Sequence, residues 1–257
     1  MDLRDPVSSL SHLFTAVWAV FATAVMLRLT TGGWRRRAAI GVYGATMILV
    51  YVASATFHGL WYESPERMRL FQRLDQSAIY LLIAGTNTPL VAFVLRGRVR
   101  AAMLGVLWTL AWVGVGCLWL LPKAPHAAVV GICLGLGWAG FVPMRAYYRA
   151  LGWRAMTWVW VGTGLYTLGG LCELTEWPVL VQGWMSFHEV FHFLTAAASF
   201  TFFLFISRHV VGYRTASAVR ERTERVVHAP KRRRAVNDPR PAKRARRAGR
   251  WVGAARW

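Results

Sequence analysis

Long apolar stretches alternate with short polar or charged stretches through most of the chain. A membrane-spanning helix needs about 20 predominantly apolar residues, and seven stretches approach that length. They cover residues 12–29, 38–60, 70–95, 101–121, 127–142, 155–171 and 185–206. The pattern predicts an all-α fold, a bundle of seven transmembrane helices. Because the fifth and sixth stretches are the shortest, six spans are the alternative.

The same pattern divides the chain into three parts. Residues 1–11 form a short polar N-terminus, residues 12–207 form the membrane domain, and residues 208–257 form a basic tail. The N-terminus carries two aspartates against a single arginine, which is not the basic flank of a signal peptide. The first apolar stretch is therefore expected to be a span.

Composition supports a membrane protein. The chain is 56% hydrophobic and 16% charged, whereas a soluble domain has about 25% charged residues. Fourteen Trp and eight Tyr fit aromatic belts at the two interfaces. Cys117, Cys133 and Cys172 lie in or beside apolar runs without a CxxC pair, and we expect them to be small core residues.

The net charge of +20 comes largely from the tail. Of the 31 Lys and Arg residues, 16 lie between Arg208 and the C-terminus, including KRRR at 231–234 and KRARR at 243–247. Such a segment is predicted to be disordered and attracted to anionic lipid headgroups. Nucleic acid also attracts polybasic tracts, but in a membrane protein it is the less favoured partner.

Arginines in the loops predict the orientation of the bundle. With seven spans, the N-terminal side of the membrane carries five Lys and Arg residues and the opposite side carries ten, before the tail is counted. Basic loops stay in the cytoplasm. The N-terminus is therefore predicted outside and the C-terminus in the cytoplasm.

Polar side chains gather near one membrane face. His188 and His192 are four residues apart at the start of the last span, so they share one helix face. His58 and Ser54 lie at the end of the second span, and Asp75 lies at the start of the third. Ionisable groups within spans usually face the bundle interior and serve a function.

Three histidines suit Zn²⁺, because three protein ligands leave a fourth position for water. Bound Zn²⁺ lowers the pKa of that water toward about 7. Asp75 could deprotonate or orient the water or support a ligating histidine, and Ser54 could bind the water or a substrate carbonyl. The site is thus predicted as His58, His188 and His192 around zinc, with Asp75 and Ser54 as catalytic residues.

Simpler roles exist for each residue. His58 could be a packing residue, Asp75 could pair with Arg73 or favour a helix N-terminus, and Ser54 could bond to its own helix. Haem between two axial histidines is the other metal cofactor to consider, although three histidines and an aspartate suit a compact ion better. Four further residues are not expected to be ligands: Glu189 as a supporting or interface group, His12 and His126 at the surface, and His209 in the tail.

Three motifs carry a resemblance to a known family. SATFH (54–58), LDQSAIYLLIAGTNTP (74–89) and SFHEVFHFL (186–194) resemble the motifs of the haemolysin III family, within the progestin and adiponectin Q receptor superfamily. The likeness extends from Leu10 to Arg208 and excludes the tail. One departure is Asn87, where the motif is expected to have an aromatic residue.

The resemblance implies a seven-helix bundle with zinc held by His58, His188 and His192, and with Asp75 and Ser54 beside the metal. It also implies distant kinship with alkaline ceramidases, and hence hydrolysis of a lipid amide such as that of ceramide. We expect a multi-pass protein of a bacterial plasma membrane. Adiponectin receptors have the reverse orientation to that given by the arginines.

Three functions remain open from the sequence. The leading hypothesis is a zinc-dependent hydrolase acting on a lipid amide or ester that enters from the bilayer. The second is a receptor or membrane-homeostasis protein in which zinc is structural. The third is a pore-forming cytolysin, which would need a polar stripe through the bundle, and the fourth and fifth spans show almost none.

Overall fold

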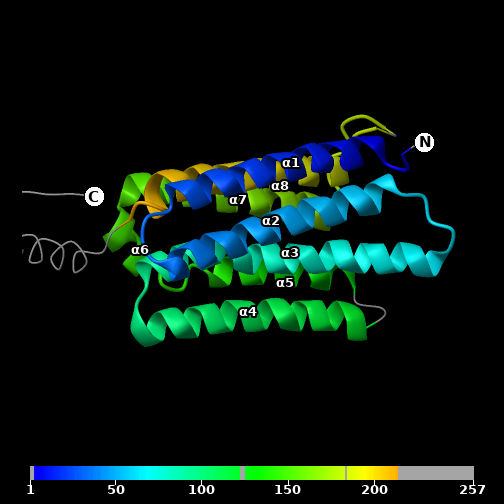
Figure 1. The fold of residues 1–257 in the computed structure, drawn as a ribbon. Coiled ribbons are helices and arrows are strands. Elements are labelled where there is room, and N and C mark those ends of the chain that lie inside the picture. Colours follow the sequence, from blue (N-terminus) through cyan, green and yellow to red (C-terminus); the bar gives the residue numbers. More distant parts are fainter. Residues whose placement is uncertain (1–2, 122–124, 183, 214–257) are drawn as a thin grey trace, which may run out of the picture. The chain divides into compact units, whose positions relative to one another are not determined.

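The computed structural model describes residues 3–121, 125–182 and 184–213. Within these ranges the chain is all-helical, with no strand beyond an isolated bridge between Val181 and Met185. The elements, drawn in Figure 1, are α1 (Pro6–Leu29), α2 (Trp34–Gly59), α3 (Pro65–Val94), α4 (Gly97–Leu120), α5 (His126–Ala139), α6 (Met144–Leu151), α7 (Trp153–Thr175), α8 (Phe187–Phe205) and the π-helical turn η1 (Ile206–Val210). The all-α prediction is confirmed.

The helices enclose a common interior. Along the chain, α1 packs against α2 and α2 against α3, while α8 packs against both α1 and α7. Helix α5 completes the circle because it contacts both α3 and α7. Helix α4 contacts α3 and α5 and lies at the edge of the bundle (Figure 1). The interior is therefore lined by α1, α2, α3, α5, α7 and α8.

Five helical segments of the described chain are long and apolar enough to cross a membrane: α1, α2, α3, α4 and the segment Phe187–Val210 formed by α8 and η1. The protein is thus an integral membrane protein. The predicted fifth span corresponds to α5, which has only 14 residues and meets α6 at a bend of 49°. The pair counts as a sixth span if taken together.

The predicted sixth span corresponds to α7. With 23 residues it is long enough, since about 20 residues cross the hydrocarbon core. It is not one of the five segments that are both long and apolar enough to cross a membrane, because Thr, Gly, Tyr and Trp residues replace many of the aliphatic side chains found in the other helices.

Two predicted loops are partly helical. Residues 62–69 were expected to form a loop, but α3 already begins at Pro65, where the Ser64 hydroxyl accepts a hydrogen bond from the Arg67 amide. Residues 144–154 were also expected to form a loop, yet they contain α6. Arg145 and Arg149 are four residues apart and share one face of α6, while its Tyr147 side chain is buried.

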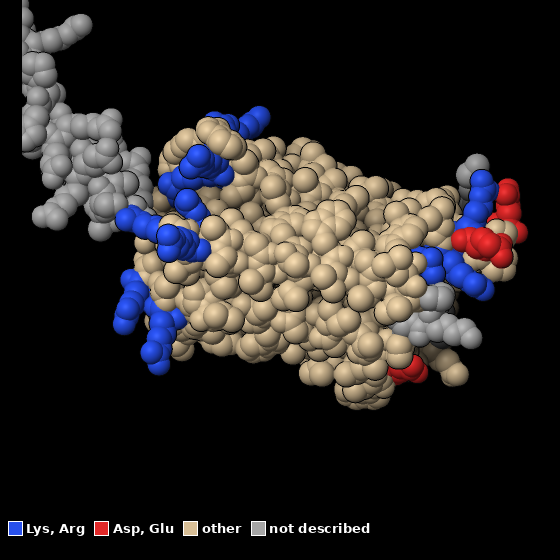
Figure 2. Space-filling view, turned by 90° about the horizontal axis from the view of Figure 1, so that it is seen from below, with Lys and Arg blue, Asp and Glu red and all other residues tan. Residues whose placement is uncertain are grey.

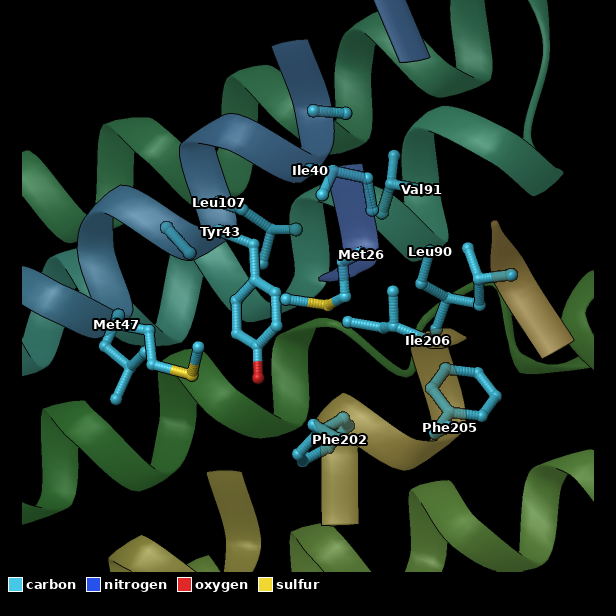
Figure 3. Packing of buried hydrophobic residues seen from close by; sticks show 14 of the residues in the cluster. Met26, Ile40, Tyr43, Met47, Leu90, Val91, Leu107, Phe202, Phe205 and Ile206 are labelled. Atoms are coloured by element: carbon cyan, nitrogen blue, oxygen red, sulfur yellow. The ribbon is translucent and has the colours of Figure 1, made fainter. Parts of the chain in front are cut away.

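Close packing joins the helices at the centre of the bundle. Figure 3 shows Tyr43 and Met47 of α2 facing the aromatic ring of Phe202 from α8, among other buried side chains. Small residues allow the backbones to approach. A Cβ atom added at Gly85 of α3 would collide with the side chain of Thr46 of α2. The helix stays continuous through Pro89.

Charged side chains lie at the two ends of the bundle. In Figure 2 only Lys and Arg are seen at one end, while the opposite end shows acidic and basic residues together. The mixed end is the one that holds the N-terminal segment and the α2–α3 connection (Figure 1). Of the predicted basic tail, residues 208–210 belong to η1, and residues 214–257 lie outside the described residues.

Candidate metal centre

The three predicted metal ligands come together at the mixed-charge end of the bundle. His58 lies in the last turn of α2, and His188 and His192 lie in the first two turns of α8. Their candidate ligand atoms all lie within 4.8 Å of one another. His58 and His192 are 2% and 5% exposed, so the cluster is enclosed by the bundle rather than displayed on its surface.

The spacing of these imidazoles fits one metal ion. The Nε2 atoms of His58 and His188 are 3.3 Å apart. Two nitrogens bound tetrahedrally to one ion at about 2.0–2.1 Å would be separated by roughly 3.3 Å. In addition, the Nε2 atom of His192 is buried without a hydrogen-bond partner in the described part of the chain. The three residues could therefore hold a metal.

The same spacing disfavours haem. Two axial histidines bind on opposite faces of a planar macrocycle, so open space is needed between them. Here the rings of His58 and His188 are 5.1 Å apart between centroids, and the His192 ring lies 4.3 Å from that of His188. Three rings gathered this closely suit a single compact ion.

Carboxylates contact the other nitrogen of two of the histidines. The Nδ1 atom of His58 lies 2.9 Å from Oδ2 of Asp5, and Nδ1 of His188 lies 3.1 Å from Oε2 of Glu173. Neither carboxylate was predicted from the sequence, where Asp5 was considered only as a flanking charge. With Nδ1 bonded to a carboxylate, Nε2 is the atom available to a metal.

Asp75 and Ser54, the two predicted catalytic residues, border the same cavity as His188 and His192. Asp75 is 8% exposed, and the Ser54 hydroxyl serves it as a hydrogen-bond donor. Its carboxylate is not part of the compact group of ligand atoms. The alternative ion pair with Arg73 is absent from the described residues, where the Arg73 guanidinium lies over the Trp119 ring instead. Asp75 therefore borders this cavity without being one of the candidate metal ligands.

His12 contradicts the prediction that it lies at the surface. It is 4% exposed, and its ring lies 4.2 Å from the His192 ring, edge to face. Both of its ring nitrogens are buried without a hydrogen-bond partner among the described residues. The prediction was wrong because His12 was placed by its nearness to the N-terminal loop, whereas α1 begins six residues earlier, at Pro6.

Two other predictions about neighbouring residues can be checked. Glu189 is an interface group: its carboxylate accepts hydrogen bonds from Ser8 of α1 and from the backbone and side chain of Ser186, which caps α8. His126 is about half exposed and lies 3.7 Å from Glu173. The surface position predicted for His126 is confirmed.

A cavity of about 370 Å³ extends from the histidines into the bundle. Along α8 it is bordered at one end by His188 and His192 and farther on by Phe202 and Phe205. At 1.5 Å per residue, this face of α8 spans about 26 Å. His12, Ser54, Asp75 and Asn87 also border the cavity. Most of the remaining lining is aliphatic or aromatic, so the cavity joins a polar head to a long apolar body.

Asn87 marks the departure from the expected motif. Its side-chain amide donates to the carbonyl of Ile83, 3.0 Å away, and a Cβ atom added at Gly140 would collide with the Asn87 side chain. The smaller polar residue therefore lets the end of α5 approach α3 closely at this point. At Gly131 and Gly135 of α5, by contrast, an added Cβ atom would meet no neighbour within 4 Å.

The cysteines match the prediction. Cys117, Cys133 and Cys172 are free thiols, of which Cys172 is buried and the other two are partly buried. Cys133 borders the cavity, but it lies in α5, away from the histidine cluster of α2 and α8.

Comparison with known proteins places these residues in a wider context. A family model described as Haemolysin-III related matches residues 3–203. The chain is 32% identical over 171 residues to Hemolysin-3 of Bacillus cereus, and the match covers 62% of this chain and 77% of that protein. The matched family region contains every residue of the cluster.

Two further relatives are covered over smaller parts of their length. The Hemolysin-3 homolog of Bacillus subtilis strain 168 is 27% identical over 128 residues, which cover 50% of this chain and 59% of that protein. The adiponectin receptor protein of Drosophila melanogaster is 29% identical over 185 residues, which cover 65% of this chain and 42% of that protein.

Proposed function

Since this chain belongs to the haemolysin III family, we propose that it is a zinc-dependent hydrolase that cleaves the amide or ester bond of a membrane lipid, as a ceramidase does. The observation that carries the proposal is the convergence of His58, His188 and His192 at the head of a long, largely apolar cavity. Three nitrogen ligands leave a coordination position open, which is typical of catalytic zinc sites.

The proposed chemistry needs few residues. Zinc, when bound, supplies a Lewis acid that polarises a carbonyl and makes water more acidic. As the water oxygen bonds to the carbonyl carbon, Asp75 takes a proton from that water. Asp75 then gives the proton to the leaving nitrogen or oxygen as the bond to carbon breaks. Ser54 holds the Asp75 carboxylate toward the reacting group through its hydroxyl.

The shape of the cavity supports a lipid substrate. Its bordering face of α8 is about 26 Å long, comparable to the hydrocarbon core of a bilayer, about 30 Å. An acyl chain lying in this space would leave its carbonyl beside His188 and Asp75. An acyl chain that comes from the bilayer already lies in hydrocarbon, so its transfer gains little hydrophobic free energy. The apolar body of the cavity would instead select an acyl chain by packing against it and would leave the carbonyl at the polar head.

The proposal includes a topology. We propose seven spans in a bacterial plasma membrane, with α5 and α6 together as the fifth and α7 as the sixth. The cytoplasmic end carries the arginines seen alone in Figure 2, and the metal centre faces outside. The C-terminal tail is then cytoplasmic and binds anionic lipid headgroups. Likeness to adiponectin receptors favours the reverse orientation.

Metal analysis of protein purified in detergent tests the zinc site. We expect about one zinc per chain in the wild type and little in His58→Ala or His188→Ala. The matched control is His209→Ala, which removes a histidine from η1 at the other end of the same helical segment. A wild-type protein without zinc, or a His58→Ala variant with a full zinc content, would contradict the site.

Turnover is tested with a ceramide that carries a fluorescent acyl chain. Asp75→Asn is expected to keep its zinc and to lose hydrolysis by about 10²–10⁴-fold, the usual contribution of general acid–base catalysis. If the wild type binds zinc but releases no fatty acid from ceramide or from ester lipids, the hydrolase proposal fails while the metal site stands.

That outcome would favour the second function, a receptor or homeostasis protein with a structural zinc. Its supporting observation is that His58 and the two histidines of α8 would join α2 to α8 through the ion. The name of the Bacillus relatives, Hemolysin-3, suggests a third function, a cytolysin. Dye leakage from liposomes that contain the purified protein would support it, although the cavity is lined mainly by apolar side chains.

A further inference from the structure

The N-terminal segment is fixed to the last turn of α2 by several contacts. The backbone amide of Asp5 donates to the carbonyl of His58 at 3.0 Å, and the Ser9 hydroxyl donates to the carbonyl of Ala55 at 3.1 Å. The guanidinium of Arg4 lies 4.6 Å from the centre of the Phe57 ring. The position of Asp5 relative to His58 is therefore set by backbone and side-chain contacts on both sides of it.

The Asp5 side chain does not serve its own helix. Asp5 is the residue that precedes α1, the position at which an aspartate commonly accepts a hydrogen bond from the helix backbone. No such bond forms here. Instead, its carboxylate lies 2.9 Å from Nδ1 of His58. The Asp5 carboxylate thus contacts a histidine 53 residues away instead of capping α1.

Glu173 makes the corresponding contact from another helix. It lies near the end of α7, and its two carboxylate oxygens are 3.1 and 3.2 Å from Nδ1 of His188. Its side chain is only 14% exposed. A carboxylate buried to this extent is costly unless it is hydrogen-bonded. The His188 ring lies at hydrogen-bond distance from it, and the His126 ring is farther away, at 3.7 Å.

Both contacts have the same consequence for the histidine. A neutral imidazole carries its proton on one nitrogen and a lone pair on the other. When Nδ1–H donates to a carboxylate, the lone pair is on Nε2. The two Nε2 atoms face each other at 3.3 Å. No carboxylate contacts His192 among the described residues, where the ring of His12 is its neighbour instead.

We infer that Asp5 and Glu173 are positioning residues of the metal centre, which hold His58 and His188 in the orientation and tautomer that bind the ion. The inference rests on the zinc site proposed above. It assigns a function to the segment before α1 and to the end of α7, neither of which supplies a metal ligand. Outer partners of this kind typically change metal affinity by 10–100-fold when they are removed.

A graded series of variants tests the inference by metal binding. Asn at position 5 and Gln at position 173 keep a carbonyl that can accept from Nδ1–H but lack the charge, whereas Ala removes the acceptor. We expect Asp5→Asn and Glu173→Gln to weaken zinc binding by about 10-fold and Asp5→Ala and Glu173→Ala by about 100-fold. Zinc affinity is measured on the full-length protein in detergent by competition with a chelator.

Glu189→Gln is the matched control. Glu189 follows His188 directly, lies at the same end of the bundle and binds Ser8 and Ser186, but it contacts no histidine through a hydrogen bond. Its replacement perturbs the start of α8 without touching Nδ1 of a ligand. We expect its zinc affinity to stay within about 2-fold of the wild type, against the 10-fold losses above.

Cobalt substitution supplies a second readout that a purely structural role would not change. The visible absorption of bound Co²⁺ depends on ligand geometry, so the Asp5 and Glu173 variants should show shifted bands at full loading, while Glu189→Gln keeps the wild-type spectrum. Wild-type affinity and spectra in all four Asp5 and Glu173 variants would overturn this inference alone. A wild type that binds neither zinc nor cobalt would overturn the proposed function as well.

Discussion

Replacement of His12 by leucine should stabilise the metal-free protein. A neutral imidazole has one donor and one acceptor nitrogen, and both nitrogens of His12 are buried without a partner among the described residues. Each unpaired buried polar group costs about 1–3 kcal/mol. The edge-on contact with the His192 ring returns about 0.5–1 kcal/mol. Leucine has a similar size and no polar atom.

At about 1.5 kcal/mol for each nitrogen, near the low end of that range, the net gain is about 2 kcal/mol in the free energy of unfolding. For a chain of this size, 1 kcal/mol corresponds to about 2–4 °C in the unfolding midpoint, so His12→Leu should raise the midpoint by about 4–8 °C. The measurement is thermal unfolding in detergent after zinc is removed with a chelator. His209→Leu is the control, and a change below about 0.5 kcal/mol is expected there.

A lower midpoint for His12→Leu would refute this reasoning, because it would show that the imidazole is hydrogen-bonded in the metal-free protein. The expected gain in stability has a functional counterpart. His12 borders the cavity beside His192, and proteins keep such costly groups where function needs them. The same variant should therefore hydrolyse lipid more slowly than the wild type while it retains zinc.

Two further predictions concern the packing of the bundle. Gly85→Ala should lower stability by about 1–3 kcal/mol, because the new methyl group collides with Thr46 of α2, whereas Gly41→Ala meets no neighbour within 4 Å and should be neutral or stabilising in thermal unfolding. Ser199→Ala should cost about 1–3 kcal/mol, because its hydroxyl shares hydrogen bonds of 2.6 and 2.8 Å with two tyrosine hydroxyls. Ser207→Ala is its control, since the buried Ser207 hydroxyl has no partner among the described residues, and equal losses in the two serine variants would contradict the role of this network.

The three histidines could be predicted because their arrangement follows from helical periodicity and topology. The four-residue spacing of His188 and His192 places both on one face of a helix. His58 lies at the end of the second span and His188 at the start of the seventh. Because four spans lie between them, an even number, His58 is placed at the same membrane face as His188 and His192. Neither step requires knowledge of side-chain packing, and the structure brings the three residues together.

The carboxylates could not be predicted in the same way. Asp5 precedes the first helix, and its pairing with His58 depends on how the N-terminal segment packs on the last turn of α2. Glu173 lies at the end of a helix whose neighbour, α8, follows only after a connecting segment. In a sequence, a charged residue next to an apolar stretch is first interpreted as evidence for the orientation of the span. For this reason neither Asp5 nor Glu173 was considered as part of a site.

Hydropathy also misjudged the middle of the chain. A hydropathy window predicts a span from the average hydrophobicity of its residues, and it does not detect the residue at which a helix ends. The apolar run around α5 continues beyond Ala139, but the helix stops there, and Pro143 precedes the separate helix α6. The arginines of α6 were interpreted as a loop signal, although they lie four residues apart, on one face of a short amphipathic helix.

Asp75 offers the best reason to favour a reaction over a structural zinc. Its carboxylate is buried, lies outside the compact group of metal-binding atoms and has no Lys or Arg partner among the residues that the structure describes. Its hydrogen-bond donor Ser54 belongs to α2. Since α2 and α3 already pack along each other, this hydrogen bond is not needed to hold the two helices together. A buried carboxylate without a Lys or Arg partner destabilises the metal-free fold. The metal-free protein should therefore be more stable when Asp75 is replaced by Asn, whereas the proposed hydrolase needs a proton acceptor at this position.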